Sequence, residues 1–266
     1  MRWLAIVSLV LAAIVTFVPV TTTIAVSAIT DRVEIISSGS HANRWYLSGA
    51  DYFIKAGDKA IAFTGSVDVA SGVRIVVERI GLGPVSITLR PVQPEQAQLG
   101  TMYGPDDSPT GELSPKCVFR IPATPALSAS GKNIVLALTG EFKLGQISSR
   151  PATSSIPLLR QGTVTVIGNS ILSTDLIKLR SEAMDAGDVL SMEGAEGPGF
   201  GLAVVDDRPS MTVAFHIVAD RAVIARPPSS GYTVSASLFD RLKADGTLQA
   251  FWAAFVFLVG LKKLGE

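Results

Sequence analysis

Acidic side chains are the most obvious catalytic material in this chain, and they form two adjacent pairs, Asp106-Asp107 and Asp206-Asp207. A glycoside hydrolase needs two carboxyl groups about 5–9.5 Å apart. Neighbouring strand residues point to opposite faces, so adjacency in the sequence does not bring two carboxyl groups together. The run Asp206-Asp207-Arg208-Pro209 is typical of a turn. We therefore favour a non-catalytic protein, and the alternative is a hydrolase that acts on envelope glycans through a carboxylate pair.

Histidine and cysteine are too scarce for a convincing metal or nucleophilic site. The chain has two histidines, His41 and His216, and one cysteine, Cys117. It contains none of the usual zinc or nucleophile motifs, so we predict no metal and no cofactor. A calcium site of loop carboxylates is the weaker alternative, because Ca²⁺ prefers several oxygen ligands; its residues would be Asp185, Asp188, Glu193 and Glu196. We expect Cys117 to be a buried thiol, with pairing between chains as the alternative.

Aromatic side chains are the remaining candidates for a site, because their rings stack on sugars and on protein partners. Trp45, Tyr46 and Tyr52 are close in sequence, and Tyr103 lies in a proline- and glycine-rich stretch, residues 91–115. A loop of that length is unusual in a compact domain and could carry Tyr103 toward the other three. We predict that these four residues contact a ligand. In the alternative, Trp45 and Tyr46 straddle a strand, one of them in the core and one half exposed.

Short runs of alternating apolar and polar residues fill the chain from Asp31 onward. Within 84–92, Val85, Ile87 and Leu89 share one face while the intervening side chains are polar. This is the pattern of an antiparallel strand with one buried face. Similar runs, separated by turn residues, recur to residue 238 and predict a mainly β, antiparallel sandwich domain over residues 31–237.

A faint internal repeat accompanies the strand pattern. Ala56-Gly57-Asp58 opens a strand pair that ends in Val76-Val77-Glu78, and Ala186-Gly187-Asp188 opens one that ends in Val204-Val205-Asp206. The repeat has two explanations. It is either an old duplication or the succession of turns and strands that any sandwich contains, and we favour the second.

One stretch resembles the strand pair of jelly-roll carbohydrate-binding modules. It comprises Tyr52-Phe53-Ile54-Lys55-Ala56-Gly57-Asp58, Ser66-Val67-Asp68-Val69-Ala70-Ser71-Gly72 and Val73-Arg74-Ile75-Val76-Val77-Glu78, within about residues 50–90. The resemblance implies a jelly-roll-like sandwich with sugars bound on a concave face or at loop tips. The chain departs from that family after Val92, where no row of aromatic residues could form a stacking platform.

The C-terminal run 248–261 has no charged residue and is apolar on every side of a helical wheel, and Lys262-Lys263 follow it. Such a helix must lie in a core or in lipid. The run is shorter than the about 17–25 residues of a membrane-spanning helix, but its neighbours extend it and the lysine ends can reach the interface. We predict a transmembrane helix at residues 247–264, preceded by a juxtamembrane helix or linker at 238–246. A buried core helix is the alternative.

The N-terminal segment 3–29 also carries no charge. We predict an uncleaved membrane anchor; the alternative is a signal peptide cleaved after Val26-Ser27-Ala28. With Arg2 and Lys262-Lys263 at the outer ends of the two runs, the positive-inside rule places both termini in the cytoplasm and the β-domain outside it.

Composition agrees with a membrane-associated protein and excludes some partners. Apolar residues make up 47% of the chain and charged residues 17%, against about 25% charged in soluble proteins. The net charge is zero, with no basic stripe, so we expect no nucleic acid partner. The sequence thus predicts an inner-membrane protein with a periplasmic β-domain, acting as an accessory or structural subunit of a cell-envelope complex. Its expected partners are the lipid bilayer, other envelope proteins and, as a further candidate, polysaccharide.

Overall fold

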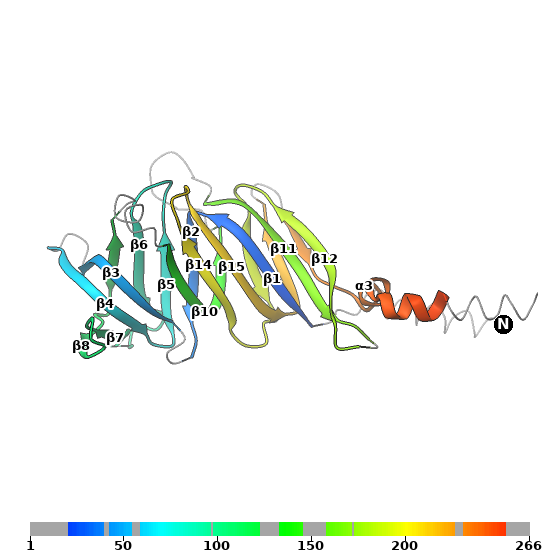
Figure 1. The fold of residues 1–266 in the computed structure, drawn as a ribbon, viewed down its shortest axis with the longest axis horizontal. Coiled ribbons are helices and arrows are strands. Elements are labelled where there is room, and N and C mark those ends of the chain that lie inside the picture. Colours follow the sequence, from blue (N-terminus) through cyan, green and yellow to red (C-terminus); the bar gives the residue numbers. More distant parts are fainter. Residues whose placement is uncertain are drawn as a thin grey trace, which may run out of the picture.

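The computed structural model describes residues 21–39, 43–54, 59–96, 98–122, 133–145, 158–171, 173–226 and 231–253. Within these ranges the chain is mainly strand, and the strand pairs are antiparallel (Figure 1). The predicted mainly β, antiparallel class is therefore confirmed. The alternating pattern explains it: β15 (Met211–Ala219) buries every second residue without exception, as a strand with one face in a core must.

The strands form two units that lie side by side along the length of the molecule (Figure 1). The first unit contains β2 (Arg32–Ser37), β3 (Arg44–Phe53), β4 (Ile61–Val69), β5 (Val73–Glu78), β6 (Val85–Pro91), β7 (Gly100–Tyr103), β8 (Pro109–Glu112) and β9 (Cys117–Ile121). The second contains β1 (Thr22–Thr30), β10 (Ile134–Leu144), β11 (Leu159–Asn169), β12 (Leu176–Met184), β13 (Val189–Glu193), β14 (Gly199–Val205), β15, β16 (Arg221–Ala225) and β17 (Tyr232–Val234).

The two units repeat one strand order. Pairing in the first unit runs β2-β5-β6-β9-β3-β4. In the second it runs β10-β14-β15-β1-β11-β12. The repeated Val-Val-acid sequences end β5 and β14, which occupy the same place in the two orders. The Ala-Gly-Asp sequences that open the repeats precede β4 and β13, which have different neighbours, so it is the shared strand order that supports a duplication, the less favoured explanation of the repeat.

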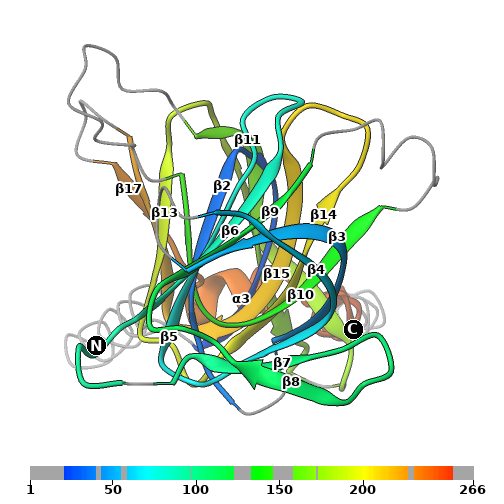
Figure 2. The same ribbon diagram turned by 90° about the vertical axis from the view of Figure 1, so that its left-hand side faces the viewer.

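Strand β10 joins the units, because it pairs with β14 along one edge and with β2 along the other. The change of partner falls at Gly140, which pairs with Gly199 and Ser37 at once. A Cβ at Gly140 would lie 2.0 Å from the carbonyl oxygen of Ile36, and its φ is 155°. Only glycine permits this close approach of two backbones. Viewed from the end, the first unit closes into a ring of strands in front of the second (Figure 2).

A buried arginine ties the two units together a second time. Arg79, which follows β5, is fully buried. Its Nη1 donates to the carbonyl oxygens of Asp206, Arg208 and Ser210 in the β14–β15 turn, at 2.8, 2.9 and 3.1 Å. The backbone N–H of Ser210 in turn donates to the carbonyl of Gly81. The equivalent turns of the two units are thus hydrogen-bonded to each other.

The predicted N-terminal segment requires a correction. Residues 22–29, assigned from sequence to a membrane anchor or signal peptide, lie in β1, between β11 and β15 in the second unit. Ile24, Val26 and Ala28 are core residues there. Cleavage after Ala28 would remove a central strand, so the β-region begins at Thr22 and not at Asp31. The remainder of the predicted anchor, 3–20, is outside the described residues.

The stretch 91–115 also differs from the prediction of a long loop without strands. It contains β7 and β8, which pair with each other, and β7 pairs with β4. Each of these strands has four residues, and they lie at the edge of the sheet, where Pro109 can begin β8 without leaving a gap in a central ladder. Strands this short give too few alternations to be recognised in a sequence.

The chain leaves the β-region through a short helix, α3 (Leu238–Ala244), which begins with a capping box between Ser237 and Asp240. Residues 246–253 are helical as well. Within the described ranges, no helix combines the length and apolarity needed to cross a bilayer. The predicted transmembrane segment 247–264 lies largely outside those ranges, which end at residue 253.

Candidate functional site

The four predicted ligand-binding residues divide into two buried and two surface side chains. Trp45 is 3% exposed, and its Nε1 donates to the carbonyl oxygen of Ala137 at 2.6 Å. Tyr52 packs on Phe119 with ring centroids 5.0 Å apart, and burial raises the pKa of its phenol. These two belong to the core.

Tyr46 and Tyr103 share the outer face of the first unit. Both pair with Ser66, Tyr46 from β3 and Tyr103 from β7, so they lie on either side of β4. Because β3 and β7 are the two antiparallel neighbours of β4, the Cα atoms of Tyr46 and Tyr103 are about 10 Å apart. Arg44 lies over the Tyr103 ring at 4.6 Å and forms an ion pair with Asp107. We call Arg44, Tyr46, Tyr103 and Asp107 the tyrosine site.

The tyrosine site presents aromatic and charged groups of the kind that proteins use for recognition. Tyr46 is 59% exposed and offers a ring face for stacking, and Tyr103 offers an edge and a hydroxyl. The guanidinium and carboxylate of the Arg44–Asp107 pair supply directional donors and acceptors at the rim. Sequence analysis did not identify Arg44 and Asp107, because their proximity depends on the β7–β8 turn that carries Asp107.

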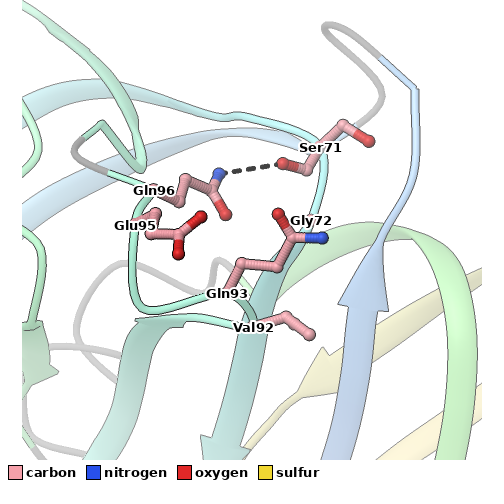
Figure 3. Close-up of a pocket in the computed structure, with 6 residues that line it drawn as sticks. All are labelled: Ser71, Gly72, Val92, Gln93, Glu95 and Gln96. Atoms are coloured by element: carbon pink, nitrogen blue, oxygen red, sulfur yellow. Dashed lines mark hydrogen bonds between the residues drawn. The ribbon is translucent and has the colours of Figure 1, made fainter.

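A shallow depression of about 410 Å³ lies farther along the same unit, between the β4–β5 turn and the segment after β6 (Figure 3). It is lined by Ser71, Gly72, Val92, Gln93, Glu95 and Gln96. Gln96 Nε2 donates to the carbonyl oxygen of Ser71 at 3.0 Å, which holds one wall in place. Amide and carboxylate groups around an open hollow suit a ligand rich in hydroxyl groups. No sequence motif marked this place.

The paired acids occupy turns. Asp106 accepts from the Ser108 hydroxyl at 2.7 Å, and this bond lowers the pKa of its carboxyl group. Asp206 accepts from the backbone N–H of Arg208 at 2.9 Å. Asp107 has a φ of 64°, a turn conformation. Asp106 and Asp206 therefore serve their own turns, while the Asp107 side chain pairs with Arg44 of β3.

Three of the candidate calcium ligands are paired with arginines, and two of these share one guanidinium. Asp188 binds Arg226 through both carboxylate oxygens at 2.7 Å, which lowers the pKa of the Asp188 carboxyl, and Asp185 forms an ion pair with the same guanidinium at 3.0 Å. Glu193 pairs with Arg221. Among the residues that the structure describes, no three His, Cys, Asp or Glu side chains gather as metal ligands would.

The remaining sequence candidates are accounted for as follows. Cys117 is a buried, free thiol, as expected, and burial raises its pKa to about 12, so the reactive thiolate is scarce near neutral pH. His216 is exposed on β15, with its ring 5.9 Å from that of Phe200. His41 lies outside the described residues.

The fold and these surfaces define a class: a two-unit antiparallel β-protein with surface groups suited to binding. In comparisons with protein-family models and with curated protein sequences, nothing matches this chain.

Proposed function

We propose that this protein is a non-catalytic β-module held at the inner membrane by the segments that flank its β-region. In this proposal the two units are periplasmic, and the protein serves as an accessory or structural subunit of a cell-envelope complex. The observation that supports it is that the β-region is entered and left at the same end. The start of β1 and the helix α3 both lie at one end of the elongated body (Figure 1).

Side-chain contacts fix this common end. Arg241 of α3 donates through Nε to the carbonyl oxygen of Asn169 at 2.6 Å, and it lines the same hollow as Thr21 and Thr22. Asp245 accepts from the hydroxyl of Ser170 and the backbone N–H of Ile171, at 2.7 and 2.6 Å. Two hydrophobic segments that leave one end of a rigid body can enter one membrane, which agrees with the basic residues at their outer ends.

Topology and membrane attachment test this proposal directly. We expect a reporter fused after Lys263 to be cytoplasmic and one inserted near Gly131 to be exported.

Membrane attachment is tested by a substitution. Phe255→Arg places a charge in the middle of the C-terminal hydrophobic run, at a cost of about 2.5–3.5 kcal/mol at a helix centre, so carbonate extraction should remove this end of the protein from the membrane. Phe251→Arg, one helical turn nearer the β-region, is the matched control and should be tolerated better. A cytoplasmic signal from the Gly131 insertion would rule the proposal out.

Polysaccharide is a second candidate partner, favoured by the tyrosine site. Of the four aromatic residues predicted to stack on sugar, Tyr46 and Tyr103 reach the surface, and the amide-lined hollow lies along the same unit. The jelly-roll assignment that first suggested sugars stays a prediction. The hydrolase alternative has no comparable support, because Asp106 and Asp206 accept hydrogen bonds within their own turns and Asp107 pairs with Arg44.

A further inference from the structure

One broad face of the molecule carries no formal charge across its centre. It is the outer face of the sheet β10-β14-β15-β1-β11-β12 in the second unit, and we call it the neutral face. Its residues are Val135, Ala137, Phe200, Leu202, Val204, Thr212, Ala214, His216, Val218, Thr23, Ala25, Ser27, Ile29, Gln161, Thr163, Thr165, Ile167, Ser181 and Ala183. His216 is its one ionisable side chain. In Figure 1 the outer face of the sheet that contains β15, β1 and β11 is turned toward the viewer.

Cross-strand pairing makes the neutral face continuous. Ala137, Leu202, Ala214, Ser27, Thr163 and Ala183 form one unbroken row through successive pairs. A second row runs Phe200, His216, Ala25, Thr165 and Ser181. Val135, Phe200 and Leu202 are 52, 49 and 45% exposed at one side of the face. An exposed contiguous apolar area marks an interaction surface, and here uncharged polar side chains such as Ser27, Thr163 and Thr165 extend it across the sheet.

The first unit provides an internal comparison, because its corresponding sheet is densely charged. The outer face of β2-β5-β6-β9-β3 carries Arg32, Glu34, Arg74, Glu78, Arg90, Arg120 and Asp51. Arg32 pairs with Glu34 and Glu78, and Arg74 pairs with Glu34. The same strand order therefore tolerates a charged exterior, so the fold does not require the neutral face to lack charge.

Charged residues surround the neutral face. Asp185 and Arg208 border one end, where they line a hollow with Ser27, Thr163 and Thr212. Glu196 borders the other end, in a hollow with Thr23 and Val218. Lys178 of β12 pairs with Ile167, so it stands on the same outer face, at its corner. An uncharged centre inside a polar rim is the usual anatomy of a protein–protein interface.

We propose that the neutral face binds the neutral face of a second copy of this chain. In a two-fold symmetric dimer, a charged residue near the symmetry axis meets the same charge on the other copy and is repelled. The centre of the neutral face has no formal charge, so this repulsion does not arise. Its size also fits. Six strands about 4.8 Å apart and seven residues at about 3.3 Å each span roughly 29 by 23 Å. Two copies would bury about 1,300 Å², at the lower limit of specific interfaces.

The symmetry of such a dimer follows from the shape of the molecule. A two-fold axis along the long axis keeps α3 of both copies at the same end (Figure 1). It also brings β15 of one copy across β15 of the other, with Ala214 near the axis. The dimer does not depend on the proposed membrane attachment, but this axis is the one that two chains held in one membrane would need.

A matched pair of charge substitutions tests the interface in the full chain, purified from whichever cell fraction contains it. Leu202→Lys places two lysines in the contact, while Leu82→Lys makes the same change at a turn of similar exposure, 51% against 45%. By light scattering we expect a dimer for the wild type and Leu82→Lys, and a monomer for Leu202→Lys. All three should melt within a few degrees of each other, because Leu202 is already half exposed.

Disulfide trapping gives a second, geometric readout. Ala214→Cys should form a covalent dimer on mild oxidation. Thr88→Cys, on the corresponding strand of the first unit, should not, and the wild-type Cys117 thiol is buried. A monomeric wild type, a dimeric Leu202→Lys, or Ala214→Cys joined only to a different protein would overturn the proposal. Carbonate extraction of the same variants separates the two hypotheses, because Leu202→Lys should stay attached to the membrane as a monomer.

Discussion

At the scale of single residues, adjacent side chains in this sequence can be buried and exposed in turn. Trp45 and Tyr46 are adjacent, yet one is buried against β10 and the other is among the most exposed aromatic side chains described. The period of a strand alone produces this difference. Composition can therefore nominate an aromatic cluster, but strand register decides which members can touch a ligand.

Alanine substitutions should separate these roles. Trp45→Ala removes a core ring and the hydrogen bond to Ala137, so we expect it to cost about 3–5 kcal/mol of unfolding free energy. Tyr46→Ala should change that free energy by less than about 0.5 kcal/mol. If polysaccharide is a partner, Tyr46→Ala and Tyr103→Ala should weaken binding about 3- to 10-fold. Denaturant titration and a glycan array measure the two effects; an array on which the wild type binds nothing would eliminate the polysaccharide candidate.

Asp245 should give the C-terminal attachment a pH dependence. Hydrogen bonds from the Ile171 backbone N–H, the Ser170 hydroxyl and the backbone N–H groups of Leu248 and Thr247 lower its pKa from 3.8 to about 2. Because the folded pKa lies below the ordinary value, its stabilising effect is complete above pH 3.8 and is lost as the pH falls toward 2.

We therefore expect hydrogen exchange in residues 238–253, corrected for its intrinsic pH dependence, to accelerate across that interval. Asp245→Asn should show faster exchange at neutral pH and a much weaker change on acidification. Asp175→Asn, at an exposed position in the β11–β12 loop that Asp245 contacts, is the control and should behave as the wild type. Identical profiles for Asp245→Asn and the wild type would contradict this role for the carboxylate.

At the scale of elements, β1 and β2 show one segment serving two sheets. They are separated only by Asp31, whose backbone N–H donates to the carbonyl of Leu158 while its own carbonyl accepts from Arg79. The Asp31 side chain also forms an ion pair with Arg160. The chain thus crosses from the second unit to the first within one residue. The first strand of the sequence, β1, completes the unit whose other strands come last in the sequence.

Truncation tests the position of β1. A chain covering residues 21–246 should fold, whereas one covering 31–246 lacks the strand between β11 and β15 and should be unfolded or aggregated. Far-ultraviolet circular dichroism and thermal melting measure this. The sequence alone favoured residue 31 as the start of the domain, so a cooperative melt of the shorter chain would restore that boundary.

At the scale of the whole molecule, the two units are linked by a shared ladder at β10 and by the buried Arg79. Burial lowers the pKa of Arg79, and the nearby carboxylates of Asp206 and Asp207 oppose that shift. The three carbonyl groups that accept from its Nη1 all belong to the other unit, while its Nε donates to the carbonyl oxygen of Gly83 in its own unit. The contact therefore fixes the position of one unit against the other.

Removal of this arginine should loosen the whole assembly. We expect Arg79→Met to cost about 3 kcal/mol, because three carbonyl groups, that of Ser210 in a buried hydrogen bond, lose a charged donor. Arg79→Lys keeps the charge but loses the planar fork, so its cost should be smaller. Arg90→Met, at an exposed position on β6, is the control and should change stability by under about 0.5 kcal/mol. Urea unfolding measures all three; equal effects of the Arg79 and Arg90 substitutions would show that the contact is dispensable.

The sequence by itself determined the class of this protein. Alternation along strands such as β15 and β6 predicts one buried face, and a few glycines and prolines mark the turns between them. It also identified the acidic turn at 206–209 and the burial of Cys117. These features follow from local physics, since side-chain direction and turn geometry depend on residues a few positions apart.

Only the tertiary structure decided which strands meet and what their outer faces carry. Backbone ladders join strands without a sequence signature, so neither the repeated strand order nor the neutral face is visible along the chain. Strand β1 shows the consequence. Its outward residues, Thr23, Ala25, Ser27 and Ile29, are uncharged and form part of the neutral face. In sequence they extend the N-terminal apolar run, and a sheet surface was therefore mistaken for a membrane segment.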